Sequence, residues 1–176
     1  ATRGAEVTLV SGPVTLHTVH PHIHRIDVES AAEMHQAAAE AFKEADAGIL
    51  CAAVADFTPE QVASQKIKRE KDDLVLRLKP TCDIAASLGK EKRPGQVLVG
   101  FALETCDEVN HAQDKLARKN FDFIVLNSLN DKGAGFRCDT NKITIIDRSE
   151  AVSYPLKSKK EVAEDIVDKL SSLFHS

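Results

Sequence analysis

The residues of this chain that could do chemistry are, first, lysines placed where an anion could bind. Lys66 opens a short basic run (residues 66–69), and Lys115 and Lys119 lie four residues apart in a stretch with helical character. Like charges at that helical spacing repel each other, and an anion between them offsets the repulsion. Lysines in a basic run or near a helix C-terminus are more often simply solvated. The pattern therefore makes all three lysines candidates for binding an anion.

Polar residues also follow two apolar runs. Asp56 comes directly after the run 48–55, and Asn127 ends the run 121–126. Unbroken apolar runs of this length suit strands of a parallel sheet that is covered on both faces. Open sheets of that kind bind ligands at the carboxyl ends of their strands. Asp56 and Asn127 are therefore candidates for ligand contact, and capping a turn is the simpler role for Asn127.

Histidines and cysteines give weaker signals. Four histidines fall within one predicted loop: His17, His20, His22 and His24. Because no cysteine or carboxylate pattern accompanies them, we expect no functional metal site there. The four cysteines form no C-x-x-C pair: Cys51, Cys82, Cys106 and Cys138. A chain of this size does not need a disulfide framework, so a reduced, cytoplasmic setting is expected.

The elements that would position these groups alternate along the chain. The predicted strands cover residues 7–10, 25–28, 48–55, 97–102 and 121–126. Three helices are predicted: one begins after Ser30, one spans residues 105–119 and one begins after Ser158. Residues 1–5 have the character of a helix end, and 142–147 with 153–156 that of an antiparallel pair. Glu33 and Glu161 complete capping boxes with the two serines. This order predicts one α/β domain over residues 1–176, with a Rossmann-like open, mostly parallel sheet flanked by helices.

One segment, residues 57–80, does not fit the alternation. Its second half alternates apolar and polar residues, which predicts a two-stranded flap that carries Lys66. Long excursions from the carboxyl end of a parallel strand usually serve a ligand site. We therefore expect the flap to belong to the functional site.

The bulk composition excludes some classes of function. Apolar residues make up 43% and charged residues 28% of the 176 residues, as in ordinary globular proteins. The formal charge of −4 argues against nucleic-acid binding, which needs a basic surface. No apolar run is long enough for a membrane span.

Six motifs occur in order with consistent gaps, and together they resemble phosphopantothenate–cysteine ligases of the bacterial, CTP-dependent type. The motifs are A-A-V-A-D-F (52–57), K-I-K-R (66–69), K-P-T-C-D-I (79–84), V-G-F-A-L-E-T (99–105), A-Q-D-K-L-A-R-K (112–119) with the strand ending at Asn127, and Gly135-Phe136 with Asp139 and Asn141. The resemblance runs from about residue 5 to residue 170.

The resemblance implies a ligase of coenzyme A biosynthesis. CTP, bound with Mg²⁺, would activate the carboxylate of 4′-phosphopantothenate as an acyl-cytidylate, and the amine of cysteine would displace the nucleotide. It also implies a homodimer and a fused or associated decarboxylase domain. The usual N-terminal glycine-rich segment of the family has no counterpart here, so the native protein is expected to be longer and this chain alone to be a poor catalyst.

The resemblance also implies roles for particular residues. Lys66 would close over the reacting groups as the catalytic residue, and Lys115 and Lys119 would bind the triphosphate. The other implied nucleotide contacts are Leu50, Cys51, Ala52, Asp56, Cys82, Asp83, Ile84, Ala85 and Phe101, and Asn127 is a candidate ligand contact. Apolar members of this set could equally be core residues.

Two other functions stay open at this point. An NAD(P)-binding oxidoreductase on the same architecture would need a G-x-G-x-x-G turn after a strand, which this sequence lacks. A non-catalytic nucleotide-binding or oligomerisation domain would not depend on Lys66.

Overall fold

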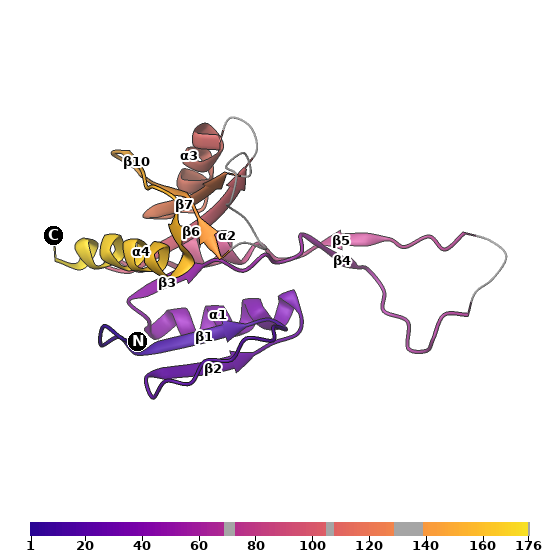
Figure 1. The fold of residues 1–176 in the computed structure, drawn as a ribbon. Helices are drawn as coiled ribbons and strands as arrows, with labels where there is room; N and C mark the ends of the chain where they lie inside the picture. The colour runs from indigo at the N-terminus through magenta and orange to yellow at the C-terminus, as the bar shows by residue number, and fades with distance from the viewer. Residues whose placement is uncertain (69–72, 105–107, 129–138, 176) are drawn as a thin grey trace. The chain divides into compact units, whose positions relative to one another are not determined.

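The computed structural model describes residues 1–68, 73–104, 108–128 and 139–175, which divide into two compact units (Figure 1). The first unit contains residues 1–40 and 52–84, and the second contains residues 41–51 and 85–176. The expectation of one ligase domain over the whole chain stays a prediction.

The second unit is built on a five-stranded sheet with the order β10-β9-β7-β6-β3. Strands β3 (Ala47–Leu50), β6 (Val97–Glu104) and β7 (Phe123–Ser128) are parallel. Strand β9 (Ile143–Asp147) pairs antiparallel with β7, and β10 (Ala151–Ser153) pairs antiparallel with β9. The predicted mostly parallel, Rossmann-like sheet is confirmed.

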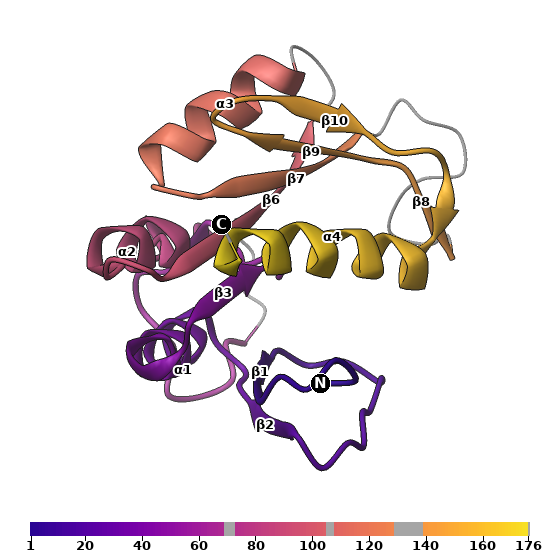
Figure 2. The same ribbon diagram turned by 90° about the vertical axis from the view of Figure 1, so that its left-hand side faces the viewer.

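Helices cover both faces of this sheet. Helix α4 (Lys159–Phe174) lies along one face, where its Val162 and Ile166 join the core formed by Val99 and Val125 (Figure 2). Side chains alternate between the faces of a strand, so neighbouring residues such as Leu98 and Ile124 point to the opposite face. That face carries α3 (Glu108–Arg118), whose Ala112 and Leu116 are buried. The short helix α2 (Ile84–Glu91) contributes the buried Leu88.

The amino end of α4 is fixed by a predicted capping box. Ser158 Oγ accepts a hydrogen bond from the backbone N–H of Glu161 (3.3 Å), and the Glu161 carboxylate accepts one from the backbone N–H of Ser158 (2.9 Å). Just before the helix, β11 (Lys157–Ser158) pairs antiparallel with β8 (Thr140–Asn141). The helix therefore begins beside Asn141.

The single tyrosine of the chain also belongs to this unit. Tyr154 packs against the core under α4, and its backbone N–H donates to the carbonyl of Ile143 (2.9 Å). The ammonium of Lys157 lies 5.5 Å from the centre of its ring. The position after β10 is therefore fixed by both backbone and side-chain contacts.

The first unit contains a parallel pair, β1 (Val7–Ser11) and β2 (Ile23–Asp27), and most of α1 (Ala31–Glu44). The capping box predicted at the start of α1 is present, since Ser30 and Glu33 exchange side-chain-to-backbone hydrogen bonds of 2.9 and 3.2 Å. Residues 57–68 and 73–80 extend as an arm (Figure 1), which we call the flap. Its base is the antiparallel pair β4 (Phe57–Pro59) and β5 (Leu78–Pro80).

Several predicted boundaries were wrong. The strand predicted over 48–55 ends at Leu50, because only residues 47–50 have a partner on β6. Residues 1–5 form a turn rather than a helix end, with Gly4 at a φ of +90°. The strand predicted over 153–156 lies at 151–153, closer to β9, and helix α2 was not predicted. The segment 74–79 of the flap, in which apolar and polar residues alternate, forms a strand only from Leu78 onwards.

A half-buried ion pair joins the end of β9 to α4 and gives a prediction about pH. Asp147 accepts hydrogen bonds from Lys169 Nζ (2.6 Å), Ser149 N (2.7 Å) and Glu150 N (2.9 Å). Burial alone would raise the pKa of Asp147, but the bonds from Lys169, Ser149 and Glu150 outweigh it and hold the pKa well below its ordinary value of 3.8. The stabilisation is therefore complete above pH 3.8 and is lost as the pH falls towards the lowered pKa of the folded protein.

We expect Lys169→Met to lower the free energy of unfolding by about 1–2 kcal/mol at pH 7, because it removes a charged hydrogen bond from a partly buried carboxylate. Urea denaturation at pH 7 and at pH 2–3 measures the effect, and the difference from wild type should shrink at the lower pH. Lys160→Met, which removes an exposed charge from the same helix, is the control. An equal loss at both pH values would show that the ion pair is not the cause.

Candidate functional site

The carboxyl ends of the parallel strands bring three predicted site residues to one edge of the five-stranded sheet. Leu50, the last residue of β3, pairs with Gly100, next to Phe101 on β6. Asn127, near the end of β7, pairs with Leu103, two residues beyond Phe101. Because all three strands run in the same direction, Leu50, Phe101 and Asn127 lie towards the edge where open sheets bind ligands. We call it the carboxyl edge.

Phe101 and Asn127 also share a face of the sheet. Phe101 pairs with Val125, so Phe101, Val125 and Asn127 project to the same side, which is the side of α4. Phe101 is half-buried and packs against the core there, so it is partly a core residue. Asn127 is half-buried beside it. An aromatic surface and a carboxamide therefore lie together on adjacent strands.

The side chain of a second asparagine, Asn141, is hydrogen-bonded to that of Asn127. Nδ2 of Asn141 donates to Oδ1 of Asn127 (2.7 Å), and Oδ1 of Asn141 accepts from the backbone N–H of Lys142 (3.0 Å). Asn141 was predicted only as part of a motif, and no local pattern in the sequence indicates this contact. The rest of that motif, residues 135–138, lies outside the described residues.

The residues predicted around the flap lie at its base or along it. Thr81, next to β5, donates from its backbone N–H to the carbonyl of Asp56 (2.9 Å) and from its hydroxyl to the carbonyl of Ala55 (2.6 Å). These bonds bring Asp56 and Cys82 to the base of the flap, where both are exposed. Lys66 is exposed on the flap itself, and Ala52 is exposed in the segment that precedes it. Arg69 lies outside the described residues.

The segment predicted to contact the base of the nucleotide is partly helical. Cys82 and Asp83 are exposed, but Ile84 and Ala85 form the first turn of α2. Ile84 is buried, at 9% exposure, so its side chain is a core residue of the described structure. Asp83 stands where helix N-caps are commonly acidic or polar. That residue is the signal from which the helix could have been predicted.

The two helical lysines lie away from the carboxyl edge. Lys119 follows α3 directly, its backbone N–H donates to the carbonyl of Lys115 (3.0 Å), and both side chains are half-buried. Asn120 donates to the carbonyl of Gly89 on α2 (2.9 Å), which places the end of α3 beside α2. Because α3 connects the end of β6 to the start of β7, Lys119 lies near the start of β7, whereas Asn127 lies near its end. Lys66 belongs to the other unit, so the prediction that the three lysines converge stays open.

Cysteine and histidine chemistry adds little to this site. Cys51 directly follows β3 and is exposed at the surface, but the protein atoms around its thiol desolvate it and raise its pKa, which disfavours a nucleophilic role at neutral pH. His22 Nδ1 lies 2.5 Å from the Glu6 carboxylate, and its ring is 5.6 Å from that of His20. Within the described ranges, no three His, Cys, Asp or Glu side chains come together as a metal site. Within the same ranges, the helices lack the length and apolar character needed to cross a lipid bilayer.

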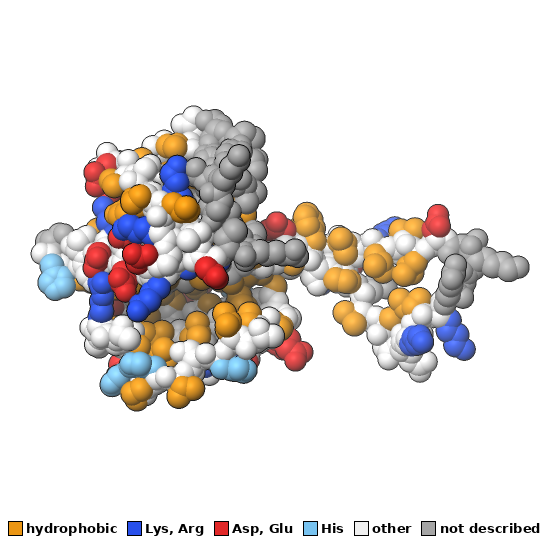
Figure 3. Space-filling view, in the orientation of Figure 1, with side chains coloured by type: hydrophobic (Ala, Val, Ile, Leu, Met, Phe, Trp, Pro, Cys, Tyr) orange, Lys and Arg blue, Asp and Glu red, His pale blue; other side chains and the backbone are white. Residues whose placement is uncertain are grey.

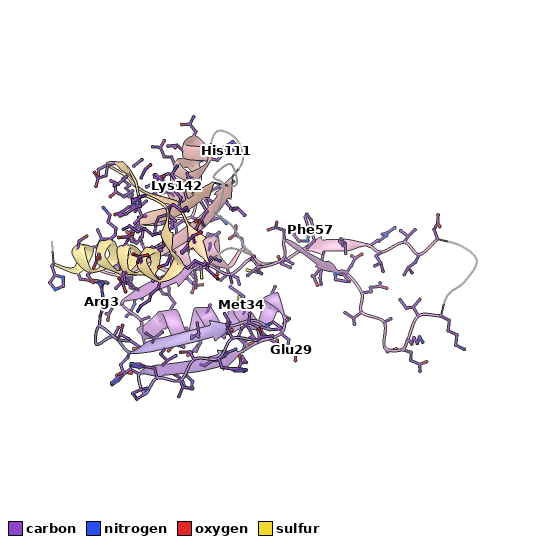
Figure 4. The ribbon with its side chains drawn as sticks, viewed as in Figure 1. Arg3, Glu29, Met34, Phe57, His111 and Lys142 are labelled. Atoms are coloured by element: carbon purple, nitrogen blue, oxygen red, sulfur yellow. The ribbon has the colours of Figure 1, made fainter. Side chains whose placement is uncertain are left out.

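The flap exposes apolar side chains along its length (Figure 3). They are Phe57, Val62, Ile67, Leu74, Val75, Leu76 and Leu78, each more than half exposed. Phe57 stands at the base of the flap (Figure 4). Contiguous exposed apolar surface of this kind usually marks an interaction site.

Comparisons with known proteins find similar sequences that match almost the whole chain. The family model described as the DNA/pantothenate metabolism flavoprotein C-terminal domain matches residues 1–173. The chain is 58% identical to a cysteine/cysteine sulfinic acid decarboxylase of an unknown prokaryotic organism, covering 99% of this chain and 49% of that protein. It is 43% identical to the coenzyme A biosynthesis bifunctional protein CoaBC of Bacillus subtilis (strain 168), covering 97% of this chain and 42% of that protein.

A solved structure is similar throughout. The crystal structure of the C-terminal domain of coenzyme A biosynthesis bifunctional protein CoaBC superposes with a TM-score of 0.82 at 35% identity, covering 99% of this chain and 77% of that chain. The chain thus spans less than half the length of the two curated relatives.

Proposed function

Because the chain belongs to the family of DNA/pantothenate metabolism flavoprotein C-terminal domains, we propose that it joins 4′-phosphopantothenate to cysteine in coenzyme A biosynthesis. The observation that carries this proposal is the family match, which extends over residues 1–173. The similarity in fold and sequence to the C-terminal domain of CoaBC supports it.

The proposed reaction has two steps. In the first, a carboxylate oxygen of 4′-phosphopantothenate attacks the α-phosphorus of CTP, and pyrophosphate leaves. In the second, the amine of cysteine attacks the acyl carbon of the acyl-cytidylate, CMP leaves, and the amine loses a proton. Both steps bring anions together, so the protein must supply positive charge and hydrogen-bond donors where negative charge develops.

We assign the positive charge to lysines. Lys66, on the exposed flap, would approach the reacting groups when the flap closes, and closure would exclude water that could hydrolyse the intermediate. Lys115 and Lys119, one helical turn apart, would bind phosphate groups of CTP. Since they lie at the other end of the sheet from Asn127, this role requires a site that a second protomer completes.

The remaining proposed contacts are apolar, backbone or short polar groups. Phe101 would pack against the nucleotide, and the backbone of residues 50–52 and 82–85 would bind the base and sugar, with Asp56 as a polar contact. The partial burial of Phe101 and the exposure of Asp56 and Cys82 are compatible with these roles.

Mg²⁺ is part of the proposal only through the nucleotide. The described residues offer no group of carboxylate, histidine or cysteine side chains that fits a protein-held metal. Phosphate oxygens usually supply most of the ligands of nucleotide-bound Mg²⁺.

We further propose that the protein is a cytoplasmic homodimer and works with a decarboxylase domain, fused or associated. The exposed apolar side chains of the flap support a protein–protein contact. The name of one relative, a bifunctional protein, and that of another, a decarboxylase, support a second domain.

The test is a product assay with the full-length protein. We expect pyrophosphate release to require CTP and 4′-phosphopantothenate, and formation of the phosphopantothenoyl–cysteine conjugate, seen by mass spectrometry, to require cysteine as well. ATP in place of CTP tests the nucleotide, and a thermal-shift comparison of CTP–Mg²⁺ with NAD(P) tests the oxidoreductase alternative. Carbon dioxide from cysteine alone, without conjugate under any condition, would favour a decarboxylase and contradict the proposal.

A further inference from the structure

Two carboxamides at the carboxyl edge form a directed chain of hydrogen bonds. It begins at the backbone N–H of Lys142, which can only donate, and which lies 3.0 Å from Oδ1 of Asn141. Since that oxygen accepts, the other end of the Asn141 carboxamide is its Nδ2 group, which donates to Oδ1 of Asn127 (2.7 Å). Asparagine oxygen and nitrogen atoms are assigned from such networks, and a backbone donor removes the ambiguity. This series of hydrogen bonds therefore directs the Nδ2 group of Asn127 to donate to a further acceptor.

Regular strands hold both asparagines in place. Asn127 pairs in register with Leu103 of β6 on one side and with Ile143 of β9 on the other. Asn141 pairs with Lys157 of β11, directly before the capped amino end of α4. Both side chains are half-buried, which limits their rotamers. Asn127, held by strands on both sides, is suited to present a donor in one fixed orientation.

The donor lies on the face of the sheet that also carries Phe101. The two residues are diagonal neighbours on adjacent parallel strands, since Phe101 pairs with Val125 and Asn127 follows two residues later. A nucleotide packed against Phe101 would thus place its phosphate or acyl group within reach of the residues at the end of β7.

We propose that Asn141 is a positioning residue, which orients the carboxamide of Asn127 so that its Nδ2 group donates to an oxygen that gains negative charge during ligation. This inference rests on the proposed function. Fixed donors aimed at developing negative charge are worth more than donors that must reorient, because no reorganisation is needed as the charge forms.

Two substitutions at Asn141 separate positioning from a purely structural role. In Asn141→Asp, the carboxylate still accepts from Lys142 N–H but cannot donate, so Asn127 must turn its Nδ2 group towards Asp and present its oxygen to the reacting groups. We expect kcat to fall about 100-fold, with KM for CTP changed by less than about threefold. In Asn141→Ala, Asn127 can rotate and still present its donor part of the time, so we expect a smaller loss of kcat, roughly tenfold.

Stability should follow the opposite order. Asn141→Asp keeps its hydrogen bonds to Lys142 and Asn127, whereas Asn141→Ala loses both, so the Asp variant should melt at the higher temperature. A structural role predicts that activity follows stability, with Ala worse than Asp. Greater activity in the Asp variant than in the Ala variant, or full activity in both, would overturn the inference.

A measurement without turnover keeps the test independent of the proposed function. With asparagine selectively labelled with ¹⁵N, the side-chain amide protons of Asn127 should shift downfield in Asn141→Asp, because one of them then donates to a carboxylate. Unchanged Asn127 signals would overturn the chain of hydrogen bonds. If the signals shift as expected but the wild-type protein forms no conjugate, the proposed function fails and with it the catalytic purpose assigned to Asn127.

Discussion

Replacing Lys66 with methionine should reduce ligase turnover by about 100-fold or more, because it removes the positive charge that we assign to the reacting acyl and phosphate groups. Methionine keeps most of the apolar stem of lysine, so little else should change. Lys66 is exposed on the flap, and its loss should leave the melting temperature within about 2 °C of wild type, as for most exposed substitutions. Steady-state kinetics with CTP, 4′-phosphopantothenate and cysteine would measure the effect in the full-length protein.

The matched control is Arg77→Met, which removes a positive charge from another exposed position of the flap. We expect that variant to keep turnover within about threefold of wild type, since a distant exposed charge is screened by salt. Equal losses in the two variants would mean that the overall charge of the flap matters rather than Lys66. Unchanged turnover in Lys66→Met would show that Lys66 is not the catalytic residue.

Replacing Gly89 with alanine should cost about 3 kcal/mol of stability, since overpacking against atoms that cannot move is among the costlier core changes. A Cβ at this position would lie 2.0 Å from the carbonyl oxygen of Lys119 and 2.9 Å from its carbonyl carbon. These are backbone atoms, and the turn that contains them is held by neighbouring bonds. Asn120, at a φ of +53°, donates to Gly89 O (2.9 Å), and its own carbonyl accepts from Lys92 (2.9 Å).

Urea denaturation followed by circular dichroism would measure this loss, and a decrease of roughly 10 °C in the melting temperature should accompany it. Gly12→Ala is the control, since its Cβ would meet only the terminal methyl of Met34, at an ordinary 3.7 Å. That variant should stay within about 1 kcal/mol of wild type. Wild-type stability in Gly89→Ala would show that α2 and the end of α3 are not packed as closely as the structure has them.

The parts of the fold that depend on local chemistry were predictable. Ser30 with Glu33 and Ser158 with Glu161 define helix starts within four residues of sequence, and both capping boxes form. The apolar runs at 97–102 and 121–126 become the central strands because they are covered on both faces. The run 48–55 has the same composition, but composition does not tell where the neighbouring strand stops, so its end was placed too late.

The candidate site was less predictable, because its arrangement depends on contacts between distant segments. Asn127 and Asn141 meet through the pairing of β7 with β9 and of β8 with β11, which no local pattern contains. The spacing of Lys115 and Lys119 predicted a shared helix face but not the end of the sheet at which it would lie. Helix α2 was missed because it is only eight residues long and follows a segment with loop character.

The position of Tyr154 has a spectroscopic consequence. The chain contains one tyrosine and no tryptophan, so its near-ultraviolet emission comes from a single fluorophore. That ring packs between the core and the ammonium of Lys157, the residue directly before the N-cap Ser158 of α4. The fluorescence quantum yield of Tyr154 therefore reports on the packing around the start of α4. A tryptophan introduced into the flap could be excited selectively at longer wavelength, without background from the rest of the chain.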